Sequence, residues 1–358
     1  MKAKHLKIAL GAGLIGLVSL PAFAADDLEK LMQDDNQWVS QRKNYSSNGY
    51  SKLSQINKAN IKNLKAAWTF ATGVNRGHEG APLVIGDTMY FATAFPNNVY
   101  ALDLNNEEKI KWSYFPKQDP SVQALLCCDN VTRGLAYGDG KIFLQQNDGV
   151  LVALDAKTGA KVWDTTVVDV KQGATTTNAP HVFKDKVITG CSGGEYGVRC
   201  YLTAYNIKDG SIAWRAYSTG PDSEVLIGKD FNKDNPHYSA LSVYEDVNGG
   251  NKEGGSYKAL PKDKLKFPEK DLGVKTWLKP QATKNGWEQG GGATWGWYSY
   301  DSALNLVYYS TGNPSVWNPD VRPGDNKWSM TIFARDLDTG VATWGYQLTP
   351  HDEWDFAG

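Results

Sequence analysis

Ala153-Leu-Asp-Ala-Lys-Thr-Gly-Ala-Lys-Val-Trp163 is a phrase that the chain repeats. Copies of the same length run from Ala204 to Trp214 (AYNIKDGSIAW) and from Ala334 to Trp344 (ARDLDTGVATW), and a looser copy without the glycine runs from Ala101 to Trp112. Each copy places short apolar runs on both sides of a polar turn, which predicts a β-hairpin that ends in tryptophan. Because one hairpin cannot bury its apolar face alone, the recurrence predicts stacked or radially arranged copies.

The spacing of the copies indicates the architecture. The first three copies begin at residues 101, 153 and 204, and this repeat of about fifty residues suits one four-stranded blade of a β-propeller. Four blades are recognisable, at about residues 66–112, 134–163, 179–216 and 293–347. We therefore predict an all-β propeller rather than a β-sandwich, because sandwiches do not repeat a tryptophan-ended phrase at a fixed period.

Two of the predicted blades carry extra loop. In each blade a polar turn and a short β-rich run precede the phrase. The distance from this turn to the alanine that opens the phrase is the same in the first two blades, and it is longer in the third and fourth. Rigid scaffolds display functional groups on inserted loops. We therefore expect chemistry in the two insertions, which contain Glu195 and Asn313.

The N-terminus predicts export. Three lysines precede an apolar stretch from Ile8 to Leu20, and Ala22-Phe23-Ala24 matches a signal-peptidase site, so residues 1–24 are predicted to be a signal peptide cleaved after Ala24. The stretch is too short to span a bilayer. A G-x-G-x-x-G inside it has no strand before it and does not indicate a dinucleotide site. The formal net charge of −1 leaves no basic footprint for nucleic acid.

The four cysteines fit an oxidising compartment. Cys127 directly precedes Cys128, and neighbouring Cα atoms lie about 3.8 Å apart, below the usual range for disulfides, so a bridge between them would strain the peptide. Two packed thiols are the alternative. Cys191 and Cys200 can also pair across the insertion of the third blade, and the sequence leaves that pairing open.

Several long stretches resemble the large subunit of quinoprotein methanol dehydrogenases, and more broadly the alcohol dehydrogenases that depend on pyrroloquinoline quinone (PQQ). They are RGHEGAPLV from Arg76, CCDNVTRGLAYGDG from Cys127, CSGGEYGVR from Cys191, WGWYSYD from Trp295, TGNPSVWNPDVRPGDNKW from Thr311 and TPHDEWDFAG from Thr349. The resemblance implies an eight-bladed propeller with tryptophan docking, so we expect residues 25–358 to be the N-terminal part of a longer domain, and we expect this part alone to be poorly soluble and inactive.

The resemblance implies a metal site and a catalytic base. Glu195 and Asn313 would be the protein ligands of a Ca²⁺ that also binds PQQ, since Ca²⁺ prefers six to eight oxygen ligands. Asp355 would accept the proton of the alcohol while hydride passes to the C5 carbonyl of PQQ, which the metal polarises. In lanthanide-using relatives an additional aspartate stands two residues after the base, and Ala357 at that position favours calcium.

The resemblance also implies contacts with the quinone. Arg133 would hold a polar edge as a fixed donor fork, Trp295 would stack on one face, and a Cys127–Cys128 disulfide would lie on the other. Ala293-Thr294 departs from the Thr-Asn pair that is common in the family, which puts one minor contact in question. The full set of implied contacts is Glu79, Cys127, Cys128, Arg133, Thr177, Ser192, Gly193, Gly194 and Trp295.

Taken singly, these residues have structural explanations. Glu195 and Asn313 suit ordinary turns, Asp355 suits a solvated acidic segment, and Trp295 suits a propeller core. A non-enzymatic propeller scaffold for outer-membrane protein assembly is the alternative function, and it gives no reason for Cys127–Cys128, Glu195 or Asp355 together.

The combined prediction is a periplasmic enzyme that oxidises a short primary alcohol, methanol being favoured, to the aldehyde. The resemblance implies that electrons pass to a cytochrome c and that a small β subunit completes an α2β2 assembly. Residues 247–272 are rich in Gly, Lys and Glu, so they are predicted to be a solvated loop, with docking of the cytochrome as the sharper alternative.

Overall fold

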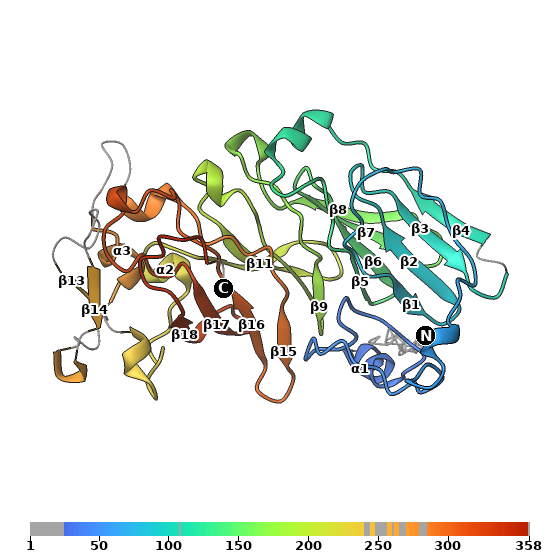
Figure 1. The fold of residues 1–358 in the computed structure, drawn as a ribbon, viewed down its shortest axis with the longest axis horizontal. Coiled ribbons are helices and arrows are strands. Elements are labelled where there is room, and N and C mark those ends of the chain that lie inside the picture. The colour runs from blue at the N-terminus through green and yellow to red at the C-terminus, as the bar shows by residue number, and fades with distance from the viewer. Residues whose placement is uncertain are drawn as a thin grey trace, which may run out of the picture.

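The computed structural model describes residues 25–106, 109–239, 244–247, 256–259, 261–264, 270–278 and 285–356; the predicted signal peptide and Ala357 lie outside these residues. Four antiparallel four-stranded sheets follow one another across the molecule, from β1–β4 on the right of Figure 1 to β15–β18 on the left. Within each sheet the strands keep their sequence order, as propeller blades do. The predicted all-β fold with four blades is confirmed.

The strands of the four blades have the following bounds. The first blade contains β1 (Leu83–Ile85), β2 (Thr88–Ala92), β3 (Val99–Asp103) and β4 (Lys109–Tyr114). The second contains β5 (Leu135–Gly138), β6 (Lys141–Gln145), β7 (Val150–Asp155) and β8 (Lys161–Thr166). The third contains β9 (His181–Phe183), β10 (Lys186–Thr189), β11 (Tyr201–Asn206) and β12 (Ile212–Tyr217). The fourth contains β15 (Ser299–Asp301), β16 (Leu306–Ser310), β17 (Thr331–Asp336) and β18 (Ala342–Gln347).

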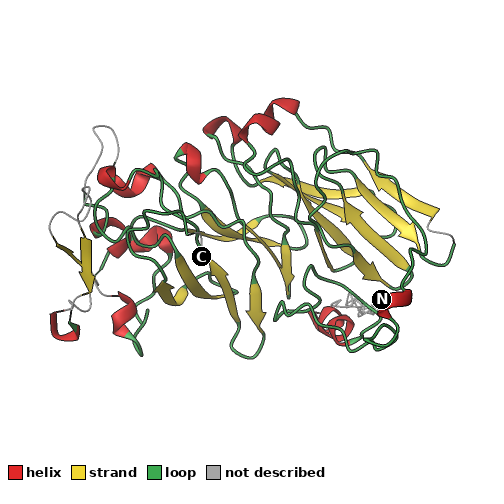
Figure 2. Cartoon of the chain, in the orientation of Figure 1, coloured by secondary structure: helices red, strands yellow, loops and turns green. Residues whose placement is uncertain are grey.

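The remaining elements are short and lie outside the blades (Figure 2). β13 (Tyr244–Val247) and β14 (Ser256–Ala259) pair antiparallel in a separate two-stranded sheet. The α-helices are α1 (Ala25–Gln33), α2 (Asp222–Val225) and α3 (Leu272–Lys275). The 3-10 helices are η1 (Ile61–Asn63), η2 (Pro120–Leu125), η3 (Val170–Gln172), η4 (Gly194–Tyr196), η5 (Pro236–Ser239), η6 (Lys262–Lys264), η7 (Gly286–Gln289) and η8 (Pro319–Val321). No helix in the described ranges is long and apolar enough to cross a bilayer.

One predicted boundary was wrong. The first blade was expected from about residue 66, but its sheet begins at Leu83, and residues 66–82 run as an irregular segment with mostly exposed side chains. Phe70 nevertheless packs edge-on against Phe91 and Tyr100, with ring centroids 5.5 and 5.2 Å apart. Phe70 therefore packs on the blade, although its segment adds no strand to the sheet.

The repeated phrase is explained by pairing within each blade. Its alanine and its tryptophan lie directly opposite each other on the two outer strands, as in Ala153 and Trp163. The register shifts immediately after the alanine in all four copies. The four alanines are fully buried, so a small residue makes room for the indole across the strand pair. The paired positions are Ala101 and Trp112, Ala153 and Trp163, Ala204 and Trp214, and Ala334 and Trp344.

The glycine of the phrase receives the tryptophan of the preceding blade. Trp163 Nε1 donates to the carbonyl oxygen of Ile207 in the third blade at 3.2 Å, and its ring lies against Gly210. Gly210 has φ +72°, and a Cβ there would lie 2.6 Å from Trp163 Cε3. The same relation joins Trp112 to Gly159 and Trp214 to Gly340. The tryptophan of one phrase thus packs against the glycine of the phrase in the next blade.

Replacing Gly210 by alanine should destabilise the blade contact. The left-handed backbone alone costs about 1 kcal/mol, and displacing the buried indole adds about 1–3 kcal/mol. Gly140→Ala is the matched control, because Gly140 has φ +68° and nothing within 4 Å of an added Cβ. Urea unfolding should show a clearly larger loss for Gly210→Ala, and equal losses would contradict the docking role.

The segment after the predicted signal peptide packs beneath the blades. Leu28 and Met32 of α1 join the main hydrophobic core, and Trp38 pairs its backbone with Val84 of β1. Tyr45 lies between Phe183 of the third blade and Tyr300 of the fourth, with centroids 5.5 and 5.1 Å from its own. This segment therefore connects separate blades through their innermost strands.

A buried histidine lies on the innermost strand of the third blade. The His181 ring packs 4.8 Å from the ring of Tyr298, its Nδ1 contacts the carbonyl oxygen of Ala179 at 3.2 Å, and its Nε2 has no partner in the described residues. Complete burial lowers the pKa of His181 to about 4. The folded protein therefore favours the neutral form of the His181 ring.

His181 should make the protein sensitive to acid. Its pKa is lower in the folded protein than in the unfolded chain, so the unfolded chain binds the proton first as the pH falls. Below about pH 6.5 the free energy of unfolding should drop by about 1.4 kcal/mol per pH unit until about pH 4. Urea titrations at several pH values should show a slope smaller by this amount in His181→Phe than in the wild type. An unaltered slope in His181→Phe would contradict the assignment.

Candidate cofactor and metal site

The blade topology brings the predicted site residues to one face. In a four-stranded antiparallel blade, the loop before the first strand and the loop between the second and third strands emerge at the same end. Arg133, Thr177 and Trp295 lie before the first strands of their blades, and Glu195 and Asn313 lie between second and third strands. Those second-to-third connections span residues 93–98, 146–149, 190–200 and 311–330. The two predicted insertions are therefore present and face the same way.

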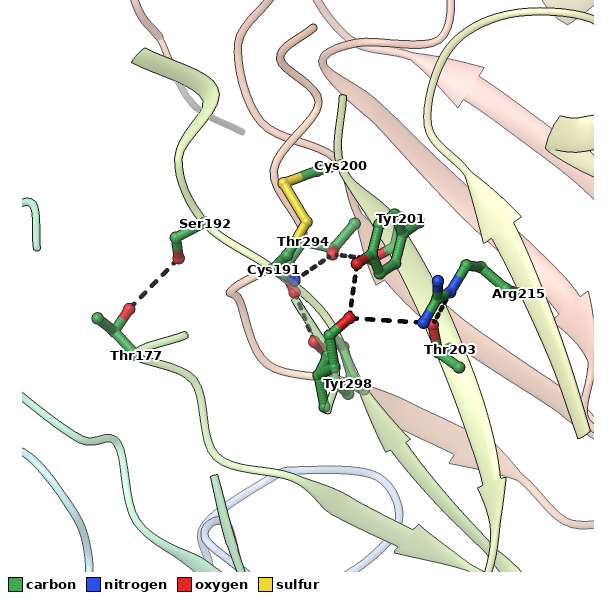
Figure 3. The surroundings of a disulfide bond; sticks show 10 residues. Thr177, Cys191, Ser192, Cys200, Tyr201, Thr203, Arg215, Thr294 and Tyr298 are labelled. Carbon is green, nitrogen blue, oxygen red and sulfur yellow. Dashed lines mark hydrogen bonds between the residues drawn. A yellow bond between two sulfur atoms is a disulfide. The ribbon is translucent and has the colours of Figure 1, made fainter. Parts of the chain in front are cut away.

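A disulfide closes the loop that carries Glu195. Cys191 and Cys200 are bonded and fully buried, with Cα atoms 5.7 Å apart, so the pairing that the sequence left open is formed (Figure 3). Thr294 braces both ends, because its Oγ1 accepts from the Cys191 N–H at 3.1 Å and donates to the Tyr201 carbonyl at 2.7 Å. The residue that departs from the family's Thr-Asn pattern thus has a structural role.

The predicted rim residues lie at the base of this loop. Ser192 pairs its backbone with Thr175, and Ser192 Oγ lies 3.5 Å from Thr177 Oγ1 (Figure 3). Gly193 has φ +111°, and a Cβ there would lie 2.4 Å from the carbonyl oxygen of Gly173. A Cβ on Gly194 would lie 3.4 Å from Gly291 Cα. Glycine at position 193 is therefore required for the loop to fold back so tightly.

Arg133 contacts three other predicted site residues, which precede the first strands of the other three blades. Its Nη1 donates to Thr177 Oγ1 at 2.8 Å, and its Nε lies 3.5 Å from a carboxylate oxygen of Glu79. Its guanidinium carbon lies 4.6 Å from the centroid of the Trp295 ring. A donor fork beside an aromatic face is suited to a flat group that bears carbonyl or carboxylate oxygens.

Asn313 and Asp355 are in contact. With the carboxamide of Asn313 oriented to satisfy both its ends, its oxygen accepts from Trp317 Nε1 at 3.0 Å and its nitrogen donates to Asp355 Oδ1 at 3.2 Å. A cavity of about 240 Å³ opens on both residues. Burial raises the pKa of the Asp355 carboxyl, and the neighbouring Asp352 carboxylate raises it further. A higher pKa makes Asp355 a stronger base.

Glu195 is connected to this pair through the backbone. Its side chain is exposed, and the Asn313 carboxamide bonds to Asp355 and Trp317. The Cys200 N–H donates to the carbonyl oxygen of Gly291 at 3.2 Å, and the Gly292 N–H donates to that of Asn313 at 2.8 Å. The two loops are thus hydrogen-bonded through one glycine segment, which holds the predicted ligands at a common edge.

The neighbouring cysteines do not form the implied disulfide. Cys127 and Cys128 are thiols with sulfurs 2.8 Å apart, brought together by a turn in which Cys128 has φ +63°. The contact with Cys128, with burial second, raises the pKa of Cys127 to about 12, and the charges of Glu195 and Asp355 add to the effect. A bond between neighbouring cysteines would strain the peptide that joins them. In this turn the two sulfurs are in contact but are not bonded. The cysteines nevertheless lie near both acidic residues.

The chemistry of the donor set fits a hard cation beside a flat quinone. Glu195 offers a carboxylate oxygen and Asn313 an amide oxygen, which are ligands that Ca²⁺ takes in proteins. Arg133 and Thr177 supply hydrogen-bond donors, and Trp295 supplies an aromatic face. The geometry is consistent with the predicted cofactor and metal.

Comparison with known proteins identifies the family. Residues 38–238 and 268–357 match the family described as glucose/ethanol/alcohol dehydrogenase, beta-propeller domain, which depends on PQQ. The chain belongs to this family. Within it, the chain is 50% identical over 347 residues to methanol dehydrogenase [cytochrome c] subunit 1 of Methylobacterium organophilum, covering 95% of this chain and 50% of that protein.

The names of two further relatives mention a lanthanide. A lanthanide-dependent methanol dehydrogenase of Methylorubrum extorquens is 50% identical over 358 residues, covering 100% of this chain and 53% of that protein. The solved structure of a europium-containing methanol dehydrogenase superposes with a TM-score of 0.82 at 49% identity, covering 93% of this chain and 52% of that chain. The chain spans about half the length of the curated relatives that it matches.

Part of the cavity wall in this family member was not predicted from its sequence. Trp317, Arg322, Asp352 and Trp354 line the cavity beside Asn313 and Asp355. All four lie inside stretches that already stood out as unusual, from Thr311 and from Thr349. The signal was therefore present, but nothing local distinguished these residues from ordinary loop residues.

Proposed function

We propose that the complete protein oxidises a short primary alcohol, methanol being favoured, to the aldehyde, using PQQ held with Ca²⁺. The observation that carries the proposal is the contact of Asn313 with Asp355 at the cavity, because it pairs a predicted metal ligand with the predicted base. The names of relatives at 50% identity support the same reaction class.

The chain's own residues supply binding and proton transfer. Asp355 Oδ accepts the hydroxyl proton of the alcohol, and its raised pKa favours this role. Arg133 and Glu79 bind polar edges of the cofactor, Thr177, Ser192 and the backbone of Gly193 and Gly194 line its rim, and Trp295 stacks on a face. PQQ, when bound, supplies the two-electron acceptor for the hydride of the alcohol.

The proposed metal is calcium, held by Glu195 and Asn313. Ala357, which stands where lanthanide-using relatives have an additional aspartate, supports this choice, although its position lies outside the described residues. Of two relatives at 50% identity, one is named as lanthanide-dependent and the name of the other states no metal, so overall similarity does not decide. Reconstitution of metal-free protein should give activity with Ca²⁺, and activity with La³⁺ but not Ca²⁺ would overturn the choice.

The proposed partners are a cytochrome c as electron acceptor and a small β subunit in an α2β2 assembly. Residues 247–272 were predicted to be a solvated or docking loop, but their described part contains β14, which pairs with β13, and η6; residues 248–255 and 265–269 lie outside the described residues. If the segment docks the cytochrome, deleting it should slow electron transfer without changing PQQ content. The proposed location is the periplasm, to which the signal peptide would direct the protein before cleavage after Ala24.

A dye-linked alcohol oxidation assay tests the reaction. The complete gene product, supplied with PQQ and Ca²⁺, should oxidise primary alcohols, with kcat/KM highest for the shortest members of a chain-length series. A quinone absorbance band in the purified protein separates the enzyme from the scaffold alternative, which needs no cofactor. Absence of both the band and alcohol oxidation would reject the proposal. Residues 25–358 alone are expected to be poorly soluble and inactive, and tight PQQ binding by this part would contradict that expectation.

A further inference from the structure

A buried arginine crosses between the two segments that carry Asn313 and Asp355. Arg322 follows η8 in the 311–330 loop and is 1% exposed. Its Nε donates to the Val316 carbonyl at 2.6 Å, and its Nη2 donates to the Trp317 carbonyl at 3.3 Å. These two carbonyls follow Asn313 closely along the chain, so one side of the guanidinium fixes the course of the loop after Asn313.

The same guanidinium reaches the segment of Asp355. Its Nη2 also donates to the carbonyl oxygen of Asp352 at 2.6 Å. The carboxylate of Asp352 in turn accepts from the N–H groups of Trp354 and Phe356, both at 3.1 Å, and these residues flank Asp355. Arg322 therefore fixes the start of a small turn at whose centre Asp355 lies.

Asn326 fixes the guanidinium itself. Its Oδ1 accepts from Arg322 Nη1 at 2.9 Å, and its Nδ2 donates to the Arg322 carbonyl at 2.7 Å. Asn326 is fully buried and has φ +55°. The planar fork is thus held on three sides, and a lysine ammonium, which is a compact point charge, could not reproduce its geometry.

We infer that Arg322 is a positioning residue for alcohol oxidation, which sets the placement of Asp355 relative to Asn313. The inference rests on the proposed function, because it assumes that Asp355 is the base and Asn313 a metal ligand. Arg322 acts through hydrogen bonds to backbone carbonyls on both segments. Partners that orient a functional group without touching substrate typically contribute 10–100-fold to activity or metal affinity.

Arg322→Lys in the complete holoenzyme tests the inference. The substitution keeps the charge and removes the fork, so kcat should fall about 10–100-fold while PQQ and metal content stay at the wild-type level. The deuterium isotope effect on kcat should rise as the chemical step becomes slower. Arg335→Lys is the matched control: Arg335 is also fully buried and donates to the carbonyls of Val225 and Gly340, in contacts confined to the fourth blade and α2.

Hydrogen exchange on cofactor-free protein gives a readout that does not depend on activity. The N–H groups of Trp354 and Phe356 should exchange about tenfold faster in Arg322→Lys and at the wild-type rate in Arg335→Lys. Asn326→Gly suits the left-handed backbone and keeps Arg322. It should lower kcat by about threefold and speed the exchange of the same N–H groups by about threefold. This second variant tests the inference if Arg322→Lys does not fold.

The outcomes separate the inference from the proposed function. A wild-type enzyme that does not oxidise alcohols rejects the proposed function. An active wild type with unchanged kcat in Arg322→Lys, or in Asn326→Gly where Arg322→Lys is unfolded, rejects the inference alone. Equal losses of kcat in Arg322→Lys and Arg335→Lys also reject it, because they would reflect general destabilisation.

Discussion

Replacing Asp355 by asparagine in the complete enzyme should lower kcat by about 10³-fold, within the range that a positioned general base contributes. Asparagine keeps the size of the side chain and its contact with Asn313, but it cannot accept the proton of the alcohol. Because the fold does not depend on this exposed residue, PQQ and metal content should stay close to the wild-type level. Steady-state kinetics together with quinone absorbance and elemental analysis measure all three quantities.

Asp320→Asn is the control for the loss of one carboxylate nearby. Asp320 is exposed on the same loop as Asn313 and does not line the cavity, so its substitution should leave kcat unchanged. An Asp355→Asn enzyme that retains wild-type kcat would show that the base lies elsewhere. Loss of PQQ from Asp355→Asn would instead make Asp355 a binding residue, and the role proposed for it would be wrong.

The blades were predictable because their signal is local. The alanine and tryptophan of each phrase are separated by a single turn and pair directly, and Gly210 meets Trp163 because neighbouring blades repeat the same geometry. The start of the first blade was not predictable in this way. The first blade was predicted from about residue 66, yet whether residues 66–82 pair with the sheet or only pack on it depends on contacts such as Phe70 with Tyr100.

The candidate site was predictable only in part, because its connections are remote in sequence. Inserted loops and the family resemblance pointed to Glu195, Asn313 and Asp355. The role of Arg322 could not be predicted in this way, because it depends on a hydrogen bond to the carbonyl oxygen of Asp352, thirty residues further along the chain. The resemblance implied a Cys127–Cys128 bond, while the residues themselves left a strained bridge and two packed thiols open, and the structure has thiols there.

Replacing Glu195 by glutamine should weaken calcium binding by at least about 100-fold. Glutamine keeps one oxygen ligand and removes the negative charge that a hard divalent cation favours. Substituting residues that only support ligands already costs about 10–100-fold, so loss of a charged ligand should cost at least the upper end of that range. Calorimetric titration of Ca²⁺ into metal-free protein measures the change in Kd directly.

Activity under varied calcium then separates a ligand from a structural residue. At limiting Ca²⁺ the Glu195→Gln enzyme should be nearly inactive, and millimolar Ca²⁺ should restore much of kcat, because mass action refills a weakened site. Asp164→Asn is the matched control, since Asp164 is a half-exposed carboxylate on β8 that pairs with Lys161 on the same strand. Its calcium Kd should equal that of the wild type. If Glu195→Gln bound Ca²⁺ as tightly as the wild type, Glu195 would be an ordinary turn residue, and the extra length of the third blade would need another explanation.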